Sequence, residues 1–233
     1  MAVSPTTPDA APSPAAPSPS RQRPSRTTPY SEPRWQAILA VFAIGGLRLA
    51  LPRTLTLGPQ WLLLVVAGGL LIPTVIARRR GYGRANKMLG FVISAVITCD
   101  LVVTLSALLA ALPSHAESPA ELLRSGAILW VTNVLVFASW YWRLDAGGPN
   151  AREQRTAHAQ GAFLFPQMTA ESPDRSWRPG FVDYLFVAFN TSAAFSPTDT
   201  PVLSRWAKLL SMVQAAISFT TVAVLLARGV GIL

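Results

Sequence analysis

Long apolar runs that contain almost no charge constrain this chain more than any other feature. Four of them approach or exceed the about 20 residues that a helix needs to cross a hydrocarbon core of about 30 Å. These four runs are residues 55–77, 88–112, 125–142 and 209–227. Because backbone groups in lipid must bond within their own segment, the runs have to be helical. With the shorter runs 35–51 and 181–195, they predict an all-α, polytopic transmembrane helix bundle of five to six spans.

Composition divides the chain into four regions. Residues 1–33 are rich in Pro, Ala and Ser. Such a segment buries too little apolar surface to offset its ordering entropy, which predicts a disordered tail. Residues 34–143 are predicted to form a four-helix transmembrane region, followed by a loop over 144–179. Residues 180–233 are predicted to hold a short membrane helix, a polar break and a final transmembrane helix.

The positive charge of the chain is best explained by its orientation in a membrane. A net charge of +9 would suit nucleic-acid binding in a soluble protein, but only 13% of the residues are charged and no nucleic-acid motif is present. Nucleic acid is therefore excluded as a partner. Basic residues gather in the N-terminal arm, in 78–87 and in 143–160. The positive-inside rule places these three segments in the cytoplasm, in a bacterial inner membrane.

The run 181–195 leaves the number of spans open. About 15 helical residues cover only about 23 Å. The run can cross a locally thinned membrane, which gives six spans, or dip in and return, which gives five. Arg228 near the end of the chain favours six spans, whereas Arg205 and Lys208 before the last run favour five. We prefer six spans.

Asp100 is the most informative single residue, because it lies near the middle of the run 88–112. A carboxylate at the bilayer centre costs at least about 2.5 kcal/mol, so it is expected to face the bundle. Asn133 and Gln214, in the fourth and last runs, are the polar residues expected to partner it. An ion or proton site and plain interhelical hydrogen bonding are both open interpretations.

A polar break follows the fifth run. Non-helical backbone at membrane depth is tolerated only where it lines a cavity or is buried in protein, so the break predicts the wall of a pore or polar site. The candidate residues of this wall are Asn190, Thr191, Ser192, Phe195, Ser196 and Asp199. The alternative is an ordinary turn outside the membrane core, with Pro197 and its neighbours supplying turn residues.

The basic segment 78–87 suits anionic lipid headgroups, which attract each basic side chain near the surface by about 1 kcal/mol. Its candidate residues are Arg78, Arg79, Arg80, Arg84 and Lys87. A loop that only sets the orientation explains the same charges. One cysteine, Cys99, and two histidines in different loops give no metal-ligand spacing, and no catalytic motif is present. We therefore predict no metal, no cofactor and no enzymatic activity.

The C-terminal part resembles two known groups of proteins. Residues 163–167, the stretch 181–199 and the helix up to Leu233 are similar to a family of bacterial multi-pass inner-membrane proteins without an established activity. The same part is weakly similar to the pore helix, filter and inner helix of potassium channels. There 191–196 falls on the filter motif, with Ala194 and Ser196 in place of its two glycines.

These features favour a channel-like or transport protein for ions or small solutes, in contact with the lipid bilayer and with the pathway formed in a homo-oligomer. The alternative is a non-transporting membrane scaffold or regulatory protein in which the proline-rich arm binds the partner.

Overall fold

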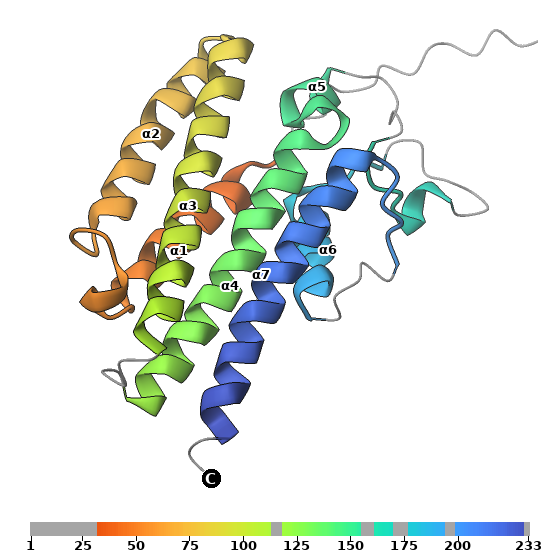
Figure 1. Ribbon diagram of the computed structural model, residues 1–233. Helices are drawn as coiled ribbons and strands as arrows, with labels where there is room; N and C mark the ends of the chain where they lie inside the picture. The colour runs from red at the N-terminus through yellow and green to blue at the C-terminus, as the bar shows by residue number, and fades with distance from the viewer. Residues whose placement is uncertain (1–31, 113–117, 155–160, 170–176, 194–198, 231–233) are drawn as a thin grey trace, which may run out of the picture. The chain divides into compact units, whose positions relative to one another are not determined.

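The computed structural model describes residues 32–112, 118–154, 161–169, 177–193 and 199–230 (Figure 1). These residues form seven α-helices, and their only strand-like feature is a single bridge between Phe163 and Val202. The predicted all-α class is confirmed.

The helices match the apolar runs of the sequence. Their bounds are α1 Trp35–Leu49, α2 Leu62–Arg79, α3 Gly83–Ala111, α4 Pro119–Leu144, α5 Pro149–Glu153, α6 Phe181–Ala193 and α7 Arg205–Val230. Four of them, α2, α3, α4 and α7, are long and apolar enough to cross a membrane, and α1 is a shorter apolar helix. The described residues thus hold a helix for each of the six predicted runs, and the short α5 lies inside the predicted loop 144–179.

Local sequence signals fix several helix ends. Ser118 and Glu121 form a capping box at the start of α4, and Pro119 occupies the first helical position, where its missing N–H costs nothing. Gly81 has a φ of +76° in the tight turn between α2 and α3, a conformation that a side chain would disfavour. The turn is short, so α2 and α3 pack against each other as a hairpin.

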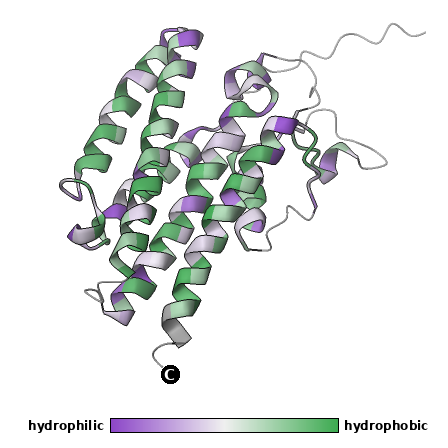
Figure 2. Cartoon of the chain, viewed as in Figure 1, coloured by the Kyte–Doolittle hydropathy of each residue, from purple (hydrophilic) through white to green (hydrophobic). Residues whose placement is uncertain are grey.

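Helix α4 lies at the centre of the bundle and contacts α1, α3, α6 and α7. Within its apolar stretch 67% of the residues are buried, against 22–39% in the other three long helices. Those three helices expose large apolar side chains instead, such as Ile72 on α2 and Phe219 on α7. Figure 2 shows that hydrophobic residues predominate along these helices. Their outward faces suit contact with lipid.

Helix α6 begins at the end of the bundle where α4 ends and α7 begins. The ring of Phe163 marks this end, because its centroid lies 5.0 Å from that of Tyr141, 6.0 Å from that of Tyr184 and 6.2 Å from that of Trp206. Those three residues belong to the end of α4, the start of α6 and the start of α7. Because α6 and α7 both begin at this end, the path of the chain favours the interpretation in which 181–195 dips in and returns, and the number of membrane spans stays a prediction. With only 13 residues, α6 is too short to reach the other end.

Candidate functional site

A polar network surrounds the inner end of α6, the end that lies inside the bundle. Gln214 on α7 donates from Nε2 to the carbonyl oxygen of Ala188 at 2.7 Å and to the hydroxyl of Ser192 at 2.8 Å. Ser218 donates to the carbonyl oxygen of Ser192 at 2.8 Å. Ser218 thus bonds one of the carbonyl oxygens that the last turn of α6 leaves without helical partners, and Gln214 adds a second bond to a carbonyl oxygen one turn earlier. We call these residues, together with Asn133, the inner-end network.

Two side chains of α4, those of Asn133 and Tyr141, bond to the residues of α6 and α7 in the inner-end network. Asn133 donates from Nδ2 to the carbonyl oxygen of Gln214 at 3.2 Å and approaches the Ser192 hydroxyl at 3.4 Å. The Tyr141 hydroxyl donates to Oε1 of Gln214 at 2.5 Å. Within the described residues, the Oδ1 atom of Asn133 is buried and has no hydrogen-bond partner. One acceptor oxygen therefore stays open beside the C-terminal end of α6.

The inner-end network lies deep in the bundle. Gln214 comes nine residues after the start of α7 at Arg205, which is about 14 Å along the helix axis. Asn133 comes eleven residues before the end of α4 at Leu144, or about 17 Å. Both distances are close to half the thickness of a bilayer core of about 30 Å.

Asp100 does not belong to this network. Its carboxylate forms an ion pair with the guanidinium of Arg48 near the end of α1, and Arg48 also donates to the carbonyl oxygen of Leu57 at 2.7 Å. The expectation that Asn133 or Gln214 partners Asp100 is wrong. A guanidinium compensates a carboxylate far better than a neutral amide does, and Arg48 is brought to Asp100 by the packing of α1 against the other helices. Asp100 does face another helix, as expected.

The remaining predicted residues of the polar break have separate environments. Thr191 is buried, and its hydroxyl bonds to the carbonyl oxygen of Val187 in its own helix at 2.8 Å. Asn190 is half-buried on α6, and Asp199 is exposed. Phe195 and Ser196 lie outside the described residues. Of the predicted site residues, the structure brings together Asn133, Ser192 and Gln214.

A second polar site, which the sequence did not reveal, lies at the end of the bundle where α4 ends. Glu32 and Arg152 are almost fully buried and form an ion pair at 3.1 Å. Trp142 donates its indole N–H to the same carboxylate. Nearby, the carboxylate of Asp145 accepts from the hydroxyl of Tyr184 at 2.6 Å and from the backbone N–H of Ala162. These bonds tie the segment before α1, the short helix α5 and the start of α6 to α4.

Arg34 extends this second site toward α2 and α3. Its guanidinium bonds to Glu153 at 3.0 Å and to the side-chain oxygens of Asn150 and Asn86 at 2.5 and 3.3 Å. Arg78 pairs with the same Glu153 at 3.1 Å. Burial lowers the pKa of Arg34, and the charge of Glu153 offsets this only in part. One carboxylate is thus shared by two arginines.

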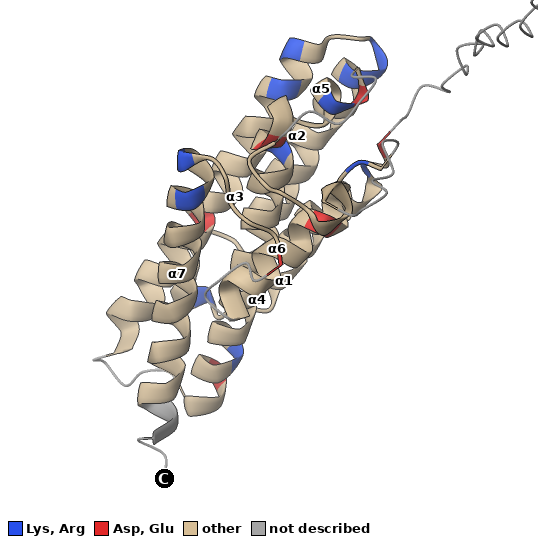
Figure 3. Ribbon diagram, turned by 90° about the vertical axis from the view of Figure 1, so that its right-hand side faces the viewer, with Lys and Arg blue, Asp and Glu red and all other residues tan. Residues whose placement is uncertain are grey.

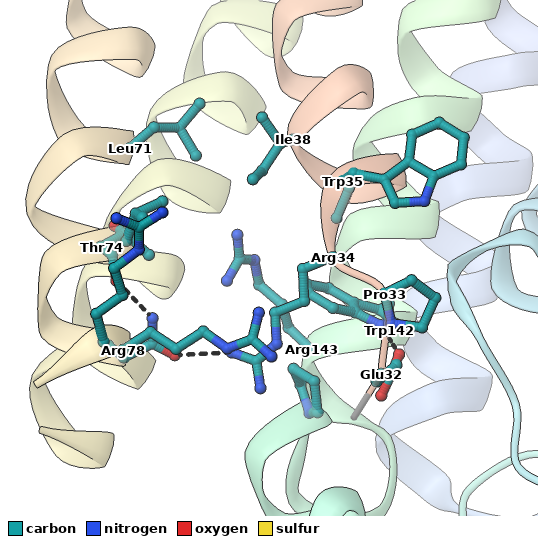
Figure 4. Close-up of a pocket in the computed structure, with 15 residues that line it drawn as sticks. Glu32, Pro33, Arg34, Trp35, Ile38, Leu71, Thr74, Arg78, Trp142 and Arg143 are labelled. Carbon is teal, nitrogen blue, oxygen red and sulfur yellow. Dashed lines mark hydrogen bonds between the residues drawn. The ribbon is translucent and has the colours of Figure 1, made fainter. Parts of the chain in front are cut away.

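A cavity of about 520 Å³ opens beside Arg34 and is shown in Figure 4. Arg34, Arg78, Arg79 and Arg143 all line it, and they come from the segment before α1, from α2 and from α4. The figure shows the side chains of Arg34, Arg78 and Arg143 pointing toward the same space. The apolar residues Ile38 and Leu71 also line the cavity and lie on the other side of this space in the figure.

Arg143 has the least compensated charge around this cavity. It forms no ion pair with any described residue, and its buried Nε atom lacks a hydrogen-bond partner there. Its neighbours are the ring of Trp142, 5.4 Å from Cζ, and the like charge of Arg34. The guanidinium also occupies the space beside Gly90 on α3, where a Cβ atom would overlap it. A buried cation with these neighbours attracts an anion.

The structure separates the basic residues of the predicted headgroup segment. Arg78 and Arg79 line the cavity, whereas Arg80 and Arg84 are exposed in and beside the α2–α3 turn. Lys87 lies 5.9 Å from the centre of the Phe91 ring. Arg34, Arg143 and Arg152 were missed as site residues because a single arginine in a short loop has the same pattern whether it is buried or only sets the orientation.

No family model, curated protein or solved structure matches this chain. The resemblances to a bacterial membrane family and to potassium channels therefore stay predictions from the sequence.

Proposed function

We propose that this protein is a multi-pass transport or channel-like protein of a bacterial inner membrane, and that it conducts or exchanges small cations at the inner end of α6. One observation carries the proposal. The short helix α6 enters the bundle and ends at about half its depth, and α7 then begins at the end where α6 began. An open acceptor oxygen on Asn133 lies beside the inner end of α6.

The electrostatics of α6 favour a cation. The C-terminal end of a helix carries about half a negative charge, and α6 points this end into the middle of the bundle. Half-helix ends and free carbonyl oxygens at membrane depth are the groups that hold Na⁺ or H⁺ in known transporters. Gln214 and Ser218 bond part of this end, and Asn133 Oδ1 adds an acceptor that no described residue uses.

The charge distribution supports an orientation with the basic end in the cytoplasm. Figure 3 shows Lys and Arg concentrated at the end that holds the α2–α3 turn, α5 and the start of α7. Arg205 and Lys208 belong to this end because α7 begins there. By the positive-inside rule α6 then enters from the cytoplasm.

Cation flux into proteoliposomes tests the proposal. We expect the wild type to pass K⁺, Na⁺ or H⁺ faster than protein-free vesicles, and Asn133→Ala to lower that flux about tenfold, because one lost hydrogen bond at a desolvated site is about 1–3 kcal/mol. Ser139→Ala is the matched control. Ser139 is also buried on α4, but its hydroxyl bonds only to Leu135 in its own helix.

A second candidate function is a non-transporting scaffold or regulatory protein. It is favoured by the closed bonding of the inner-end network, where Gln214 and Ser192 are nearly fully buried and bonded to each other. Wild-type flux equal to that of empty vesicles, for all three cations, would reject transport and leave this candidate.

A further inference from the structure

The cavity at the basic end of the bundle has two chemically different walls. One wall carries Arg34, Arg78, Arg79 and Arg143, and the other is formed by apolar residues of α1 and α2. The apolar residues are Ala37, Ile38, Leu71 and Val75. A volume of about 520 Å³ is within the range of sites that hold a small organic molecule.

The protein itself does not neutralise the basic wall. Glu153 is shared between Arg34 and Arg78, and Glu32 is already paired with Arg152 and bonded to Trp142. Arg143 therefore has no carboxylate partner in the described chain. Guanidinium groups converging from several segments match the geometry of a phosphate group, which accepts paired hydrogen bonds from arginine.

The apolar wall continues onto the outer face of the bundle. Trp35 lines the cavity and is 62% exposed, and Ile72 and Ile76, next to the lining residues on α2, are 64% and 46% exposed. An inorganic anion would contact the arginines but would leave the apolar wall uncovered. A molecule with a phosphate group and acyl chains covers both walls, since the chains can follow the exposed apolar faces of α1 and α2.

We propose that this cavity binds an anionic phospholipid, with its phosphate held by Arg143, Arg34 and Arg79 and its acyl chains lying along α1 and α2. Basic pockets between membrane helices on the cytoplasmic side hold such headgroups. The site is separate from the inner-end network and does not depend on transport.

Native mass spectrometry of the full-length protein in detergent tests the site. The probes are phosphatidylglycerol, phosphatidylcholine and inorganic phosphate. We expect phosphatidylglycerol to bind in preference to phosphatidylcholine, and Arg143→Gln to weaken its binding by about fivefold or more. Arg84→Gln is the matched control, because Arg84 is an exposed arginine near the same end that does not line the cavity.

Two further variants keep the test decisive. Arg79→Gln changes an exposed lining residue and is expected to weaken lipid binding even if Arg143→Gln fails to fold. Val75→Phe fills the apolar wall and is expected to weaken lipid binding while leaving phosphate binding unchanged. Equal binding of the two lipids, or equal effects of Arg143→Gln and Arg84→Gln, would overturn the proposal. Binding of inorganic phosphate but not of phosphatidylglycerol would also overturn it, in favour of a free-anion site.

Discussion

Arg48 and Asp100 show how two opposite charges are held in an otherwise apolar part of the bundle. The side chains are 5% and 15% exposed, and the small cavity beside them is lined mainly by apolar residues such as Leu62 and Val96. Breaking a buried ion pair from one side leaves the other charge uncompensated, at a cost of about 3–5 kcal/mol. Replacing both residues by apolar ones removes that cost.

We therefore expect Asp100→Asn to lower the thermal unfolding temperature in detergent, and Arg48→Leu combined with Asp100→Leu to recover much of the loss. Circular dichroism during heating measures both. Ser106→Ala, at an exposed serine on the same helix, serves as the control. If the double variant proves no more stable than Asp100→Asn, Arg48 and Asp100 do not act as a pair.

Glu32 is a residue whose role the sequence concealed. It falls in the region predicted as a disordered tail, yet it is 1% exposed and bonded to Arg152 and Trp142. A single glutamate next to a proline-rich segment carries no periodic pattern, and its partner lies 120 residues away. Only the packing of α1 against the end of α4 brings the two together.

Truncation is expected to distinguish the predicted tail from this anchor. Removing residues 1–31 should leave the unfolding temperature close to that of the full chain, whereas Glu32→Ala in the truncated protein should lower stability by about 3–5 kcal/mol. Glu121→Ala is the control variant, because Glu121 is exposed and the loss of its helix cap costs only about 1 kcal/mol. Equal effects of the two glutamate variants, measured by thermal unfolding, would show that the buried pair does not anchor the segment.

At the scale of elements, hydropathy alone identified the helices but not the path of α6. The apolar runs matched six helices because a helix in lipid must be long and nearly free of charge, and both properties are visible in the sequence. The direction of the chain after α6 depends on contacts of Phe163 with three other elements, which no local pattern encodes. The charges Arg205 and Lys208 were the one sequence signal that pointed to the return.

Gln214 is expected to hold α6 in place. It bonds Ala188, Ser192 and Tyr141, so Gln214→Leu removes three buried hydrogen bonds, each with a net contribution of about 0.5–1.5 kcal/mol. We expect faster hydrogen exchange in α6 and a lower unfolding temperature. Val213→Leu, at the neighbouring exposed position, should change neither quantity. Unchanged exchange in α6 of the Gln214→Leu protein would mean that other contacts fix the helix.

At the scale of the whole molecule, the proposed entry and return of α6 predicts on which side of the membrane each terminus lies. If the shorter α1 crosses together with the four long helices α2, α3, α4 and α7, the two ends of the chain lie on opposite sides, whereas a further crossing by α6 would place them on the same side. In the orientation proposed above, the N-terminus is expected in the cytoplasm and the C-terminus outside it.

Reporter fusions test this arrangement directly. Alkaline phosphatase is active only outside the cytoplasm and green fluorescent protein folds only inside it, so each is fused in turn to the N-terminus and after Leu233. We expect fluorescence from the N-terminal fusion and phosphatase activity from the C-terminal one. Fusions within the exposed α2–α3 turn, at Gly81, provide the reference for the end of the bundle that is proposed to be cytoplasmic. Fluorescence from both termini would require α6 to cross. The inner end of α6 would then no longer lie at half depth, and the proposed cation site would lose its basis.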